Sequence, residues 1–577
     1  MLYPIRNEYR QYLDLSGFWN FQIDPENRGR SEMWHSGLDH PRPIAVPASW
    51  NGQFDDYRDF LGPAWYQTNF DLPWGWENKQ VFIRCNSINY LADIWLNGQK
   101  LGNHEGGHLP FIFDLSEHIK SRNNNLIIRV DGQLASDRVP PGNITGSELD
   151  FFPSHSENFP QTQFDFFPYC GIHRPVILYI KPKEAFEDIT VITGLEGDKG
   201  LVRVAVDPDH SQFRATLEGP EQTYTTRGEG EVRFTIPQPH LWGPESPYLY
   251  NLLVEMLSGE KVIDAYSLPV GIRTISVQGN QLLLNDKPIY LKGFGRHEDF
   301  PVSGRGFNPP VAIKDFSLMK WIGANSFRTS HYPYAEQVMS LADQRGFLVI
   351  DETPAVGLFF NTDGLDRRLA LCKQYLRELI LRDKNHPSVI AWSLANEPHS
   401  TRPEAKSFFQ ELYNLGVSLD ATRPFTLVSC MGVAEESFKF LDFMFLNRYF
   451  GWYQESGQIE RGSQFLSAEL DLLYEKFQKP LILTEFGADA VPGQHALPPE
   501  MFSEEFQTVF IEAYIQVLRS KPYVIGEHIW NFADFKTSQG ITRMGGYNFK
   551  GIFTRNRRPK LAAHRLRDIW TKESEEI

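Results

Sequence analysis

Short apolar runs separated by turn residues fill the first 180 residues of the chain. Two examples are the runs at 80–84 and 92–96, each bounded by polar residues, Gly or Pro. Runs of this length and spacing are typical of β-strands. Asn97-Gly98 follows the second run and tolerates the positive φ of a type I′ turn, so it predicts a hairpin. We therefore expect residues 1–180 to form an all-β sandwich.

The same pattern continues on a smaller scale over residues 181–273. Strand-like runs occur at 202–206 and 248–254, and a Pro-rich connection lies at 237–247. A segment of about 90 residues with this pattern suits an immunoglobulin-like sandwich. A second all-β domain is therefore predicted.

After residue 273 the apolar runs alternate with stretches that have helical spacing, such as 367–383 and 404–419. The apolar runs end at polar or aromatic positions, namely His297, Arg328, Glu352, Glu397, Ser429, Asn447, Glu485 and Trp530. Eight strands alternating with helices over roughly 300 residues predict a closed (β/α)8 barrel. The expected fold is thus multidomain, with two all-β sandwiches and an α/β TIM barrel over 274–577.

Composition narrows the classes of function. A chain of 577 residues is too long for one hydrophobic core. Its net charge of -15 disfavours binding to nucleic acid or to anionic membranes. The first residues lack an apolar signal core, and no run of 18 apolar residues occurs, so we expect a cytoplasmic protein without a membrane span. The four cysteines are scattered without metal-ligand spacing or a compact disulfide framework.

Two glutamates stand where predicted barrel strands end. Glu397 follows the apolar run 389–394 within Asn396-Glu397-Pro398, and Glu485 follows the run 481–484. Barrel enzymes carry their catalytic groups at the carboxyl ends of the strands. Two carboxylates that face one bond are the working groups of a glycosidase. A single glutamate is more often a surface or capping residue, but the pair in a βα region favours catalysis.

Two long segments resemble the signatures of the family 2 glycoside hydrolases. Residues 383–397 are similar to the family's acid/base signature, and residues 325–333 are similar to its other signature. The resemblance covers essentially the whole chain and implies a jelly-roll-like sugar-binding sandwich over 1–180, an immunoglobulin-like sandwich over 181–273 and a catalytic barrel over 274–577. It also implies a retaining mechanism with Glu397 as acid/base, Glu485 as nucleophile and no cofactor or metal.

Residues 545–555 resemble the branch of the family that cleaves β-D-glucuronides. Asn548 and Lys550 look like the pair that binds the C6 carboxylate of a uronic acid. A charge-assisted hydrogen bond from a lysine would offset the water that this carboxylate loses. Arg543 would steady the loop. For a lysine or arginine considered alone, a surface position is the alternative.

Further positions match residues of the family's pocket by motif. Asn396 has an amide that can reach a sugar hydroxyl, and His297 lies at a strand tip where a substrate contact is favoured. The resemblance implies four more contacts: Asp165 would reach the sugar's distal hydroxyls, Tyr449 would hold the nucleophile by its hydroxyl, Tyr453 would contact the uronate end, and Trp530 would be the platform under the sugar ring. Helix capping for the aspartate and core packing for the others are the alternatives.

One feature departs from well-known enterobacterial relatives, in which a long insertion follows the third barrel strand and closes over the aglycone. Here only residues 355–366 separate that strand from its helix. We therefore expect an open aglycone site that favours larger or oligosaccharide glucuronides over small aryl conjugates. Relatives commonly assemble through their sandwich domains, so a homo-oligomer is also expected.

Three other functions are alternatives for this sequence. The first is another family 2 activity, as a β-galactosidase, β-mannosidase or β-galacturonidase; Asn548 and Lys550 argue against neutral sugars but not against galacturonate. The second, a non-catalytic carbohydrate-binding protein, would lack one of the two carboxylates, and both are present. The third is a metal-dependent hydrolase, for which no known motif spacing is found among the candidate ligands His297, Glu298, His331 and Glu397.

Overall fold

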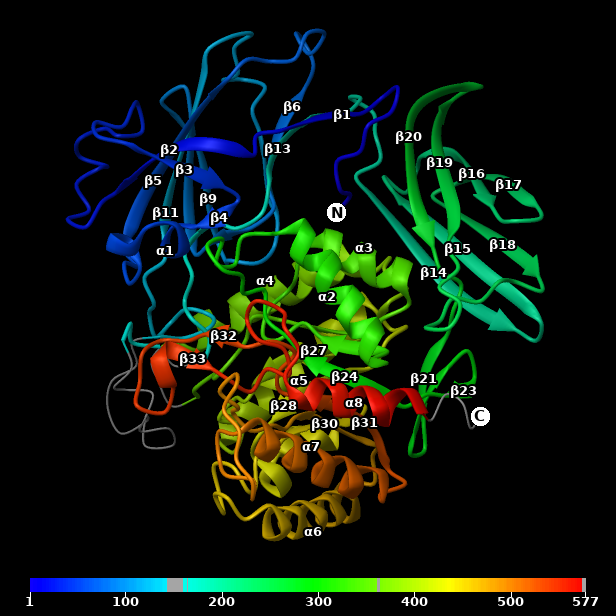
Figure 1. Cartoon of the computed structure of the whole chain (residues 1–577). Helices are drawn as coiled ribbons and strands as arrows, with labels where there is room; N and C mark the ends of the chain where they lie inside the picture. Colours follow the sequence, from blue (N-terminus) through cyan, green and yellow to red (C-terminus); the bar gives the residue numbers. More distant parts are fainter. Residues whose placement is uncertain (143–158, 163, 361–363, 573–577) are drawn as a thin grey trace.

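The computed structural model describes residues 1–577 except 143–158, 163, 361–363 and 573–577 (Figure 1). Two β-sheet domains lie side by side above a barrel surrounded by helices (Figure 1). Each part has its own buried apolar cluster, and the largest cluster belongs to the barrel and its helices. The predicted fold class, with two sandwiches and a TIM barrel, is confirmed.

The first sandwich consists of antiparallel strands. A four-stranded sheet has the order β1 (Gln11–Asp14), β13 (Val176–Ile180), β6 (Val81–Cys85), β10 (Phe111–Asp114). A six-stranded sheet has the order β3 (Arg42–Val46), β2 (Gly17–Ile23), β5 (Pro63–Phe70), β11 (Asn124–Asp131), β8 (Leu91–Leu96), β9 (Gln99–Glu105). A short third sheet and two helical turns complete the sandwich: β4 (Ala48–Ser49), β12 (Gly171–Ile172), β7 (Ile88–Asn89), α1 (Trp50–Gln53) and η1 (Asp55–Tyr57). Asn97 and Gly98, with φ of 53° and 83°, form the predicted hairpin between β8 and β9.

The second sandwich packs a three-stranded sheet against a four-stranded one around alternating apolar residues. The first sheet has the order β14 (Asp188–Glu196), β15 (Lys199–Asp207), β18 (Glu231–Pro237). The second has the order β17 (Thr223–Glu229), β16 (Gln212–Glu218), β19 (Tyr250–Ser258), β20 (Lys261–Val270). Buried and exposed residues alternate along β15, β16 and β18, which is the pattern of strands with one face on a core.

Eight parallel strands close the barrel: β24 (Leu291–Gly295), β25 (Ser326–Arg328), β26 (Leu348–Glu352), β27 (Val389–Asn396), β28 (Phe425–Ser429), β29 (Met444–Asn447), β30 (Leu481–Glu485) and β31 (Val524–Ile529). Five of these strands end at the predicted residue. The predicted ends at His297, Glu397 and Trp530 lie one or two residues too far, because in each case the chain stays at the barrel mouth after the ladder has ended. A three-stranded antiparallel sheet of β21 (Ile275–Gln278), β22 (Gln281–Leu284) and β23 (Lys287–Pro288) packs apolar side chains against the amino-terminal end of the barrel.

Helices surround the barrel: α2 (Pro309–Ile322), α3 (Glu336–Arg345), α4 (Leu365–Asp383), α5 (Pro403–Leu419), α6 (Ile459–Phe477), α7 (Glu504–Arg519) and α8 (Leu561–Lys572). Between β28 and β29 the turns η4 (Gly432–Ala434) and η5 (Glu436–Lys439) take the place of a long helix. Beyond β31, the chain forms β32 (Phe535–Lys536), η6 (Met544–Gly546) and β33 (Tyr547–Asn548) before α8. Among the described residues, no helix is both long and apolar enough to cross a bilayer.

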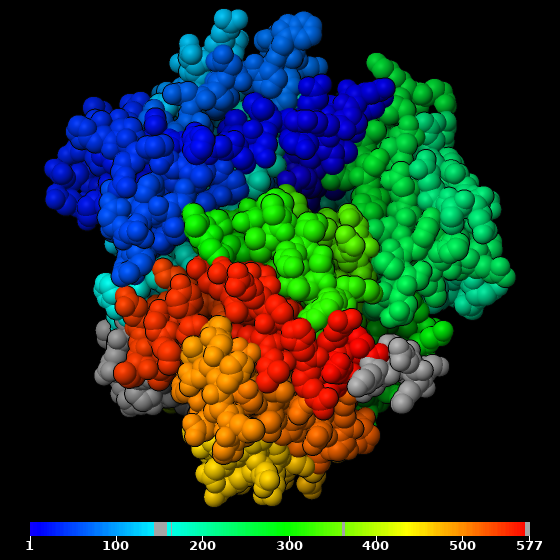
Figure 2. Space-filling view, in the orientation of Figure 1, coloured from blue at the N-terminus to red at the C-terminus, as the bar shows by residue number. Residues whose placement is uncertain are grey.

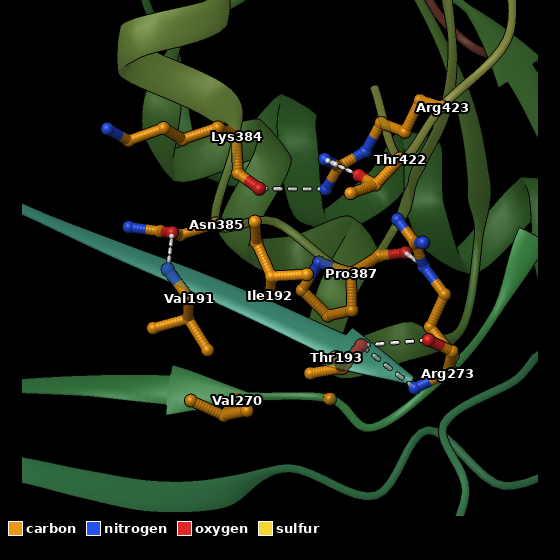
Figure 3. A pocket seen from close by; sticks show the side chains of 11 residues that line it. Val191, Ile192, Thr193, Val270, Arg273, Lys384, Asn385, Pro387, Thr422 and Arg423 are labelled. Carbon is orange, nitrogen blue, oxygen red and sulfur yellow. Dashed lines mark hydrogen bonds between the residues drawn. The ribbon is translucent and has the colours of Figure 1, made fainter. Parts of the chain in front are cut away.

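The barrel contacts both sandwiches. Arg273, at the end of the second sandwich, donates to the carbonyl oxygens of Pro387 (3.0 Å) and Val389 (2.7 Å), next to the hollow seen in Figure 3. The first sandwich meets the C-terminal loops, drawn in red against blue and cyan in Figure 2. There the Phe167 N–H donates to the Lys536 carbonyl at 2.9 Å. This contact brings a loop of the first sandwich to the barrel mouth.

Candidate active site

The carboxyl ends of the barrel strands bring polar side chains to one mouth. Parallel strands end on the same side, so Arg328 on β25, Asn447 on β29 and Glu485 on β30 share one edge. Glu397 follows β27 directly. Arg328 is fully buried, whereas Glu485 retains 4% exposure. The strand register therefore places both predicted catalytic carboxyls at the same mouth.

Glu485 is held on both of its carboxyl oxygens. Arg328 Nη2 donates to Oε1, and the Tyr449 hydroxyl donates to Oε2 at 2.8 Å. His331 Nε2 lies 3.9 Å from the same Oε1. Donors of this kind favour the ionised carboxylate and fix its orientation.

Glu397 has a neutral partner and an unusual backbone. Its Oε1 accepts from Asn447 Nδ2 at 2.7 Å, and no ion pair to Glu397 occurs within the described part of the chain. The backbone has φ of 45°, a left-handed conformation that is sparsely populated outside glycine. The Glu397 N–H donates to the Val428 carbonyl at 2.8 Å, which holds this turn. The neighbouring Asn396 Oδ1 accepts from Arg328 Nη1 at 3.3 Å and from Asn447 Nδ2 at 3.4 Å.

Burial opposes the ionised form of both carboxyls. Burial raises the pKa of Glu485 to about 8; the charge of Glu397 acts in the same direction, while Arg328 and Tyr449 oppose it. Burial also raises the pKa of Glu397, with Asn447 opposing. The direct contacts of the two groups differ, because the guanidinium of Arg328 stabilises a carboxylate more than the amide of Asn447 does. Of the two carboxyls, Glu485 therefore has the stronger donors for its ionised form.

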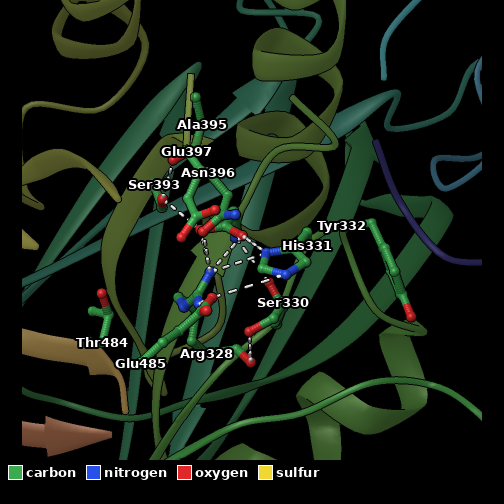
Figure 4. A network of polar contacts seen from close by, with 12 residues as sticks. Arg328, Ser330, His331, Tyr332, Ser393, Ala395, Asn396, Glu397, Thr484 and Glu485 are labelled. Carbon is green, nitrogen blue, oxygen red and sulfur yellow. Dashed lines mark hydrogen bonds and ion pairs between the residues drawn. The ribbon is translucent and has the colours of Figure 1, made fainter. Parts of the chain in front are cut away.

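Figure 4 shows Arg328 beside Glu485 and His331, and a third carboxylate, Glu352, also binds its guanidinium. Its Nη1 donates to both oxygens of Glu352, at 2.8 and 2.9 Å. Ser393 Oγ donates to Glu352 Oε2 at 2.8 Å, and His331 Nδ1 lies 3.2 Å from Oε1. Burial alone would raise the pKa of Glu352, but Arg328 and His331 lower it, so the group is ionised. This clamp fixes the guanidinium that contacts Glu485.

Aromatic rings line one wall of the mouth. Trp530 stacks on His331 with ring centroids 5.0 Å apart and an interplanar angle of 25°. His297 meets the Trp530 ring edge-on at 5.3 Å. The Arg328 guanidinium lies 5.9 Å from the Trp530 ring centroid. A flat indole held in this way can serve as a platform for a sugar ring.

His297 keeps one ring nitrogen unused. Its Nδ1 lies 3.0 Å from the Tyr332 hydroxyl, while Nε2 is buried with no hydrogen-bond partner in the described ranges. Burial lowers the pKa of His297 well below its ordinary value, and the charge of His331 acts the same way. The ring is therefore neutral. A buried polar atom without a partner is costly, and a sugar hydroxyl would supply one.

A second polar cluster joins the first sandwich to the C-terminal loops. Asp165 Oδ1 accepts from Arg543 Nε at 2.6 Å, and Oδ2 accepts from Asn548 Nδ2 at 2.7 Å. Burial alone would raise the pKa of Asp165, but these two partners and Lys550 hold it at about 2. The flanking Phe164 and Phe166 are buried in the barrel's apolar cluster. The loop of the first sandwich is thus anchored at the mouth, with its aspartate ionised.

Lys550 is fully buried within this cluster. Its Nζ donates to the Tyr453 hydroxyl at 2.9 Å and to Asp489 Oδ2. The ammonium also lies 4.7 Å from the Tyr453 ring centroid and 5.1 Å from that of Trp452. Arg543 Nη2 donates to the same Tyr453 hydroxyl at 2.9 Å. Two cations therefore converge on one phenol oxygen, whose own proton is left for another acceptor.

The two clusters are parts of one site. The rings of Tyr449, which contacts Glu485, and Tyr453, which contacts Lys550, lie 5.2 Å apart. The structure brings together all eleven predicted residues: Asp165, His297, Asn396, Glu397, Tyr449, Glu485, Tyr453, Trp530, Arg543, Asn548 and Lys550. Their individual roles stay predictions.

Sequence reasoning missed five residues of the site: Arg328, His331, Glu352, Asn447 and Asp489. Three of them stand at predicted strand ends, namely Arg328, Glu352 and Asn447, and His331 lies in the 325–333 signature. The sequence therefore contained a signal that could have marked these four residues as part of the site. Asp489 lies beyond its strand in a segment without periodicity, and nothing local marks it.

The candidate metal ligands do not form a site. Glu298 binds Arg174 Nη2 at 3.1 Å and the Ala335 N–H at 3.1 Å, and Glu397 binds Asn447. No group of three or more His, Cys, Asp and Glu side chains suited to a metal occurs among the residues that the structure describes. The short loop at 355–366, on which the open aglycone site was predicted, includes 361–363, which lie outside the described residues.

Comparison with known proteins defines the class. Residues 275–574 match the TIM barrel domain of "Glycosyl hydrolases family 2", residues 12–182 match its sugar binding domain, and residues 181–273 match a further model of that family. The chain belongs to the family 2 glycoside hydrolases and is an enzyme of that class. The domain boundaries at 180 and 273 remain our proposal.

Several similar proteins are named β-glucuronidases. The chain is 41% identical to the β-glucuronidase of Paenibacillus borealis over 100% of this chain and 99% of that protein. A solved β-glucuronidase of an uncultured Clostridium sp. has a TM-score of 0.93 at 41% identity, covering 99% of this chain and 100% of that one. The Ruminococcus gnavus enzyme in complex with uronic deoxynojirimycin has a TM-score of 0.93 at 38% identity, covering 98% and 99%.

Proposed function

We propose that this enzyme hydrolyses β-D-glucuronides by a retaining double displacement. One observation carries the proposal: a fully buried ammonium, Lys550, lies in the same site as the carboxyls of Glu397 and Glu485. Lys550 donates to Asp489 and Tyr453 and has a third N–H, for which the carboxylate of a uronic acid would be a stronger acceptor than the hydroxyl of a neutral sugar. The similar proteins described above are named β-glucuronidases, which supports the same substrate.

In the first step Glu485 attacks the anomeric carbon through one carboxylate oxygen. Arg328 and Tyr449 hold that carboxylate ionised and fixed. The bond from the anomeric carbon to the aglycone oxygen breaks as Glu397 gives its proton to that oxygen. The aglycone leaves as an alcohol, and a glycosyl ester remains on Glu485.

In the second step Glu397, now a carboxylate, takes a proton from water. The water oxygen attacks the anomeric carbon and the ester bond to Glu485 breaks, which restores both side chains and releases glucuronic acid in the β configuration. This mechanism requires the two carboxyls to lie roughly 5–5.5 Å apart. A hydrogen-bonded chain from Glu397 through Asn447, Asn396 and Arg328 to Glu485 supports this proximity.

The sugar's C6 carboxylate would bind at the second cluster. Lys550, Asn548 and the Tyr453 hydroxyl offer it donors, and Asp165 would accept from the distal hydroxyls. The unpartnered Nε2 of His297 and the Trp530 ring would contact the sugar between the two ends. β-Galacturonidase activity is the second candidate, since galacturonate carries the same carboxylate and differs only at the C4 hydroxyl.

We also propose an open aglycone site, based on the short connection between β26 and α4. A connection of this length is shorter than one that would be needed to cover the leaving group, so we expect large aglycones to be accepted. The expected result is a higher kcat/KM for glucuronate-ended oligosaccharides than for small aryl glucuronides. A strong preference for aryl glucuronides would contradict this part of the proposal and leave the chemistry intact. A homo-oligomeric assembly and a cytoplasmic location stay predictions.

A panel of four 4-nitrophenyl glycosides tests the substrate assignment: β-glucuronide, β-galacturonide, β-galactoside and β-mannoside. The β-glucuronide is expected to give the highest kcat/KM. A dominant β-galacturonide would transfer the assignment to the 4-epimer. A dominant neutral glycoside would refute the uronate site. Proton NMR of the first-formed sugar would show the β-anomer if configuration is retained.

A further inference from the structure

Asp489 lies four residues after Glu485, at the start of the loop that follows β30. It is 3% exposed. Its Oδ2 accepts from Lys550 Nζ, and its Oδ1 accepts from the Phe549 N–H at 2.8 Å. The Ala490 N–H donates to the Phe549 carbonyl at 3.0 Å, which ties the two loops together. Asp489 therefore holds both the ammonium of Lys550 and the backbone that carries it.

The second cluster has no surplus charge. Lys550 is paired with Asp489, and Arg543 is paired with Asp165, so two cations face two carboxylates. A substrate carboxylate that enters this cluster meets no net positive field. Its recognition must therefore come from hydrogen bonds in fixed directions, which requires the donors to be held in place.

The neighbouring ion pair of Lys560 and Asp534 gives a comparison, because all N–H groups of that lysine bind protein acceptors. Lys560 Nζ donates to Asp534 Oδ1 at 2.7 Å, to the Ala490 carbonyl at 2.8 Å and to the Phe549 carbonyl at 2.9 Å. Its three N–H groups are all used. Lys550 has only two acceptors among the described residues, Asp489 and Tyr453, so one N–H is left for a ligand.

We propose that Asp489 is a positioning residue for uronate recognition, which acts by fixing the Lys550 ammonium so that its third N–H points at the C6 carboxylate. The inference rests on the proposed function and deepens it. Asp489 also repels that carboxylate, but its ion pair with Lys550 offsets part of its charge, so we expect the fixed geometry of the ammonium to outweigh the repulsion.

The test compares two inhibitors that differ at C6, uronic deoxynojirimycin and the neutral deoxynojirimycin, by isothermal titration calorimetry. In Asp489→Asn the Kd of the uronic inhibitor is expected to rise about 10–100-fold, the range for a weakened charge-assisted hydrogen bond. The Kd of the neutral inhibitor is expected to change less than about 3-fold. Asp534→Asn is the matched control, since it breaks the adjacent ion pair and is expected to change both Kd values by the same factor.

A double-mutant cycle with Lys550→Met separates positioning from a general loop effect. If Asp489 acts through the ammonium, Asp489→Asn has no further effect on the uronic inhibitor once Lys550 is absent. Additive losses would overturn the inference, as would an unchanged or lower Kd in the single Asp489→Asn variant. Equal affinity of the wild-type enzyme for both inhibitors would instead refute the proposed uronate site itself.

Discussion

The catalytic end of the site rests on the tips of barrel strands, whereas the uronate end rests on loops from distant parts of the chain. Arg328, Asn447 and Glu485 are the last residues of three parallel strands. Asp165 and Arg543, by contrast, are 378 positions apart and belong to different domains. The backbone ladder sets the geometry of the first end, and side-chain ion pairs set that of the second.

Because of this difference, we expect substitutions at the catalytic end and at the uronate end to change activity in different ways. At the catalytic end the side chains stand on strand tips or within two residues of them, so we expect a substitution there to remove a chemical group and leave the frame in place. At the uronate end the side chains are themselves the frame, because Asp165, Asp489, Arg543 and Lys550 hold one another. Changes at the catalytic end should therefore affect every glycoside, and changes to Lys550 and Asp489 should affect mainly acidic ones.

Glu485→Ala is expected to have the largest effect. Loss of the nucleophile should lower kcat by at least about 10⁴-fold for every glycoside, since no other group can form the ester. The variant should still bind uronic deoxynojirimycin, because the uronate cluster is intact. Azide should restore part of the turnover and give an α-linked glycosyl azide, detected by NMR. A β-linked product would contradict the assignment of Glu485.

Lys550→Ala is expected to have a smaller and selective effect. Losing a hydrogen bond between charged groups costs about 2–3 kcal/mol, which corresponds to a roughly 30–150-fold lower kcat/KM for 4-nitrophenyl β-glucuronide. The matched measurement is the Kd of neutral deoxynojirimycin, which should stay nearly constant. An unchanged kcat/KM for the glucuronide would remove the uronate assignment and leave the glycosidase assignment in place.

The barrel and the catalytic pair could be predicted because their signals are local. An apolar run that ends at a polar residue marks both a strand and its tip, and the eight predicted ends lie within two residues of the observed ones. Glu397 and Glu485 stand at such ends. Parallel topology then brings them together without further information.

The frame of the uronate end could not be predicted in the same way. The pairing of Asp165 with Arg543 and of Asp489 with Lys550 depends on how loops of different domains pack, and no short pattern encodes it. The resemblance to the family supplied Asn548 and Lys550 as donors. It did not supply the carboxylate that holds the lysine, because that residue lies in an irregular loop.

Tyr449→Phe is expected to have the smallest effect, which is a shift in the pH profile. The Tyr449 hydroxyl donates to Glu485 Oε2 at 2.8 Å and favours the ionised nucleophile. Its removal raises the pKa of Glu485, so the acid limb of kcat/KM, which reports ionisation of the nucleophile, should move to higher pH. A lost hydrogen bond to a charged group corresponds to about 1 pH unit. The alkaline limb, which reports the proton on Glu397, should move much less.

Tyr453→Phe is the matched control at the other end of the site. Its hydroxyl contacts Lys550 and Arg543 and does not contact Glu485, so KM for the glucuronide should rise while the acid limb stays in place. If Tyr453→Phe moved the acid limb as far as Tyr449→Phe does, the two clusters would titrate as one network. The catalytic groups would then still lie at strand ends and the recognition groups on loops, but the pKa values of the two clusters would be coupled.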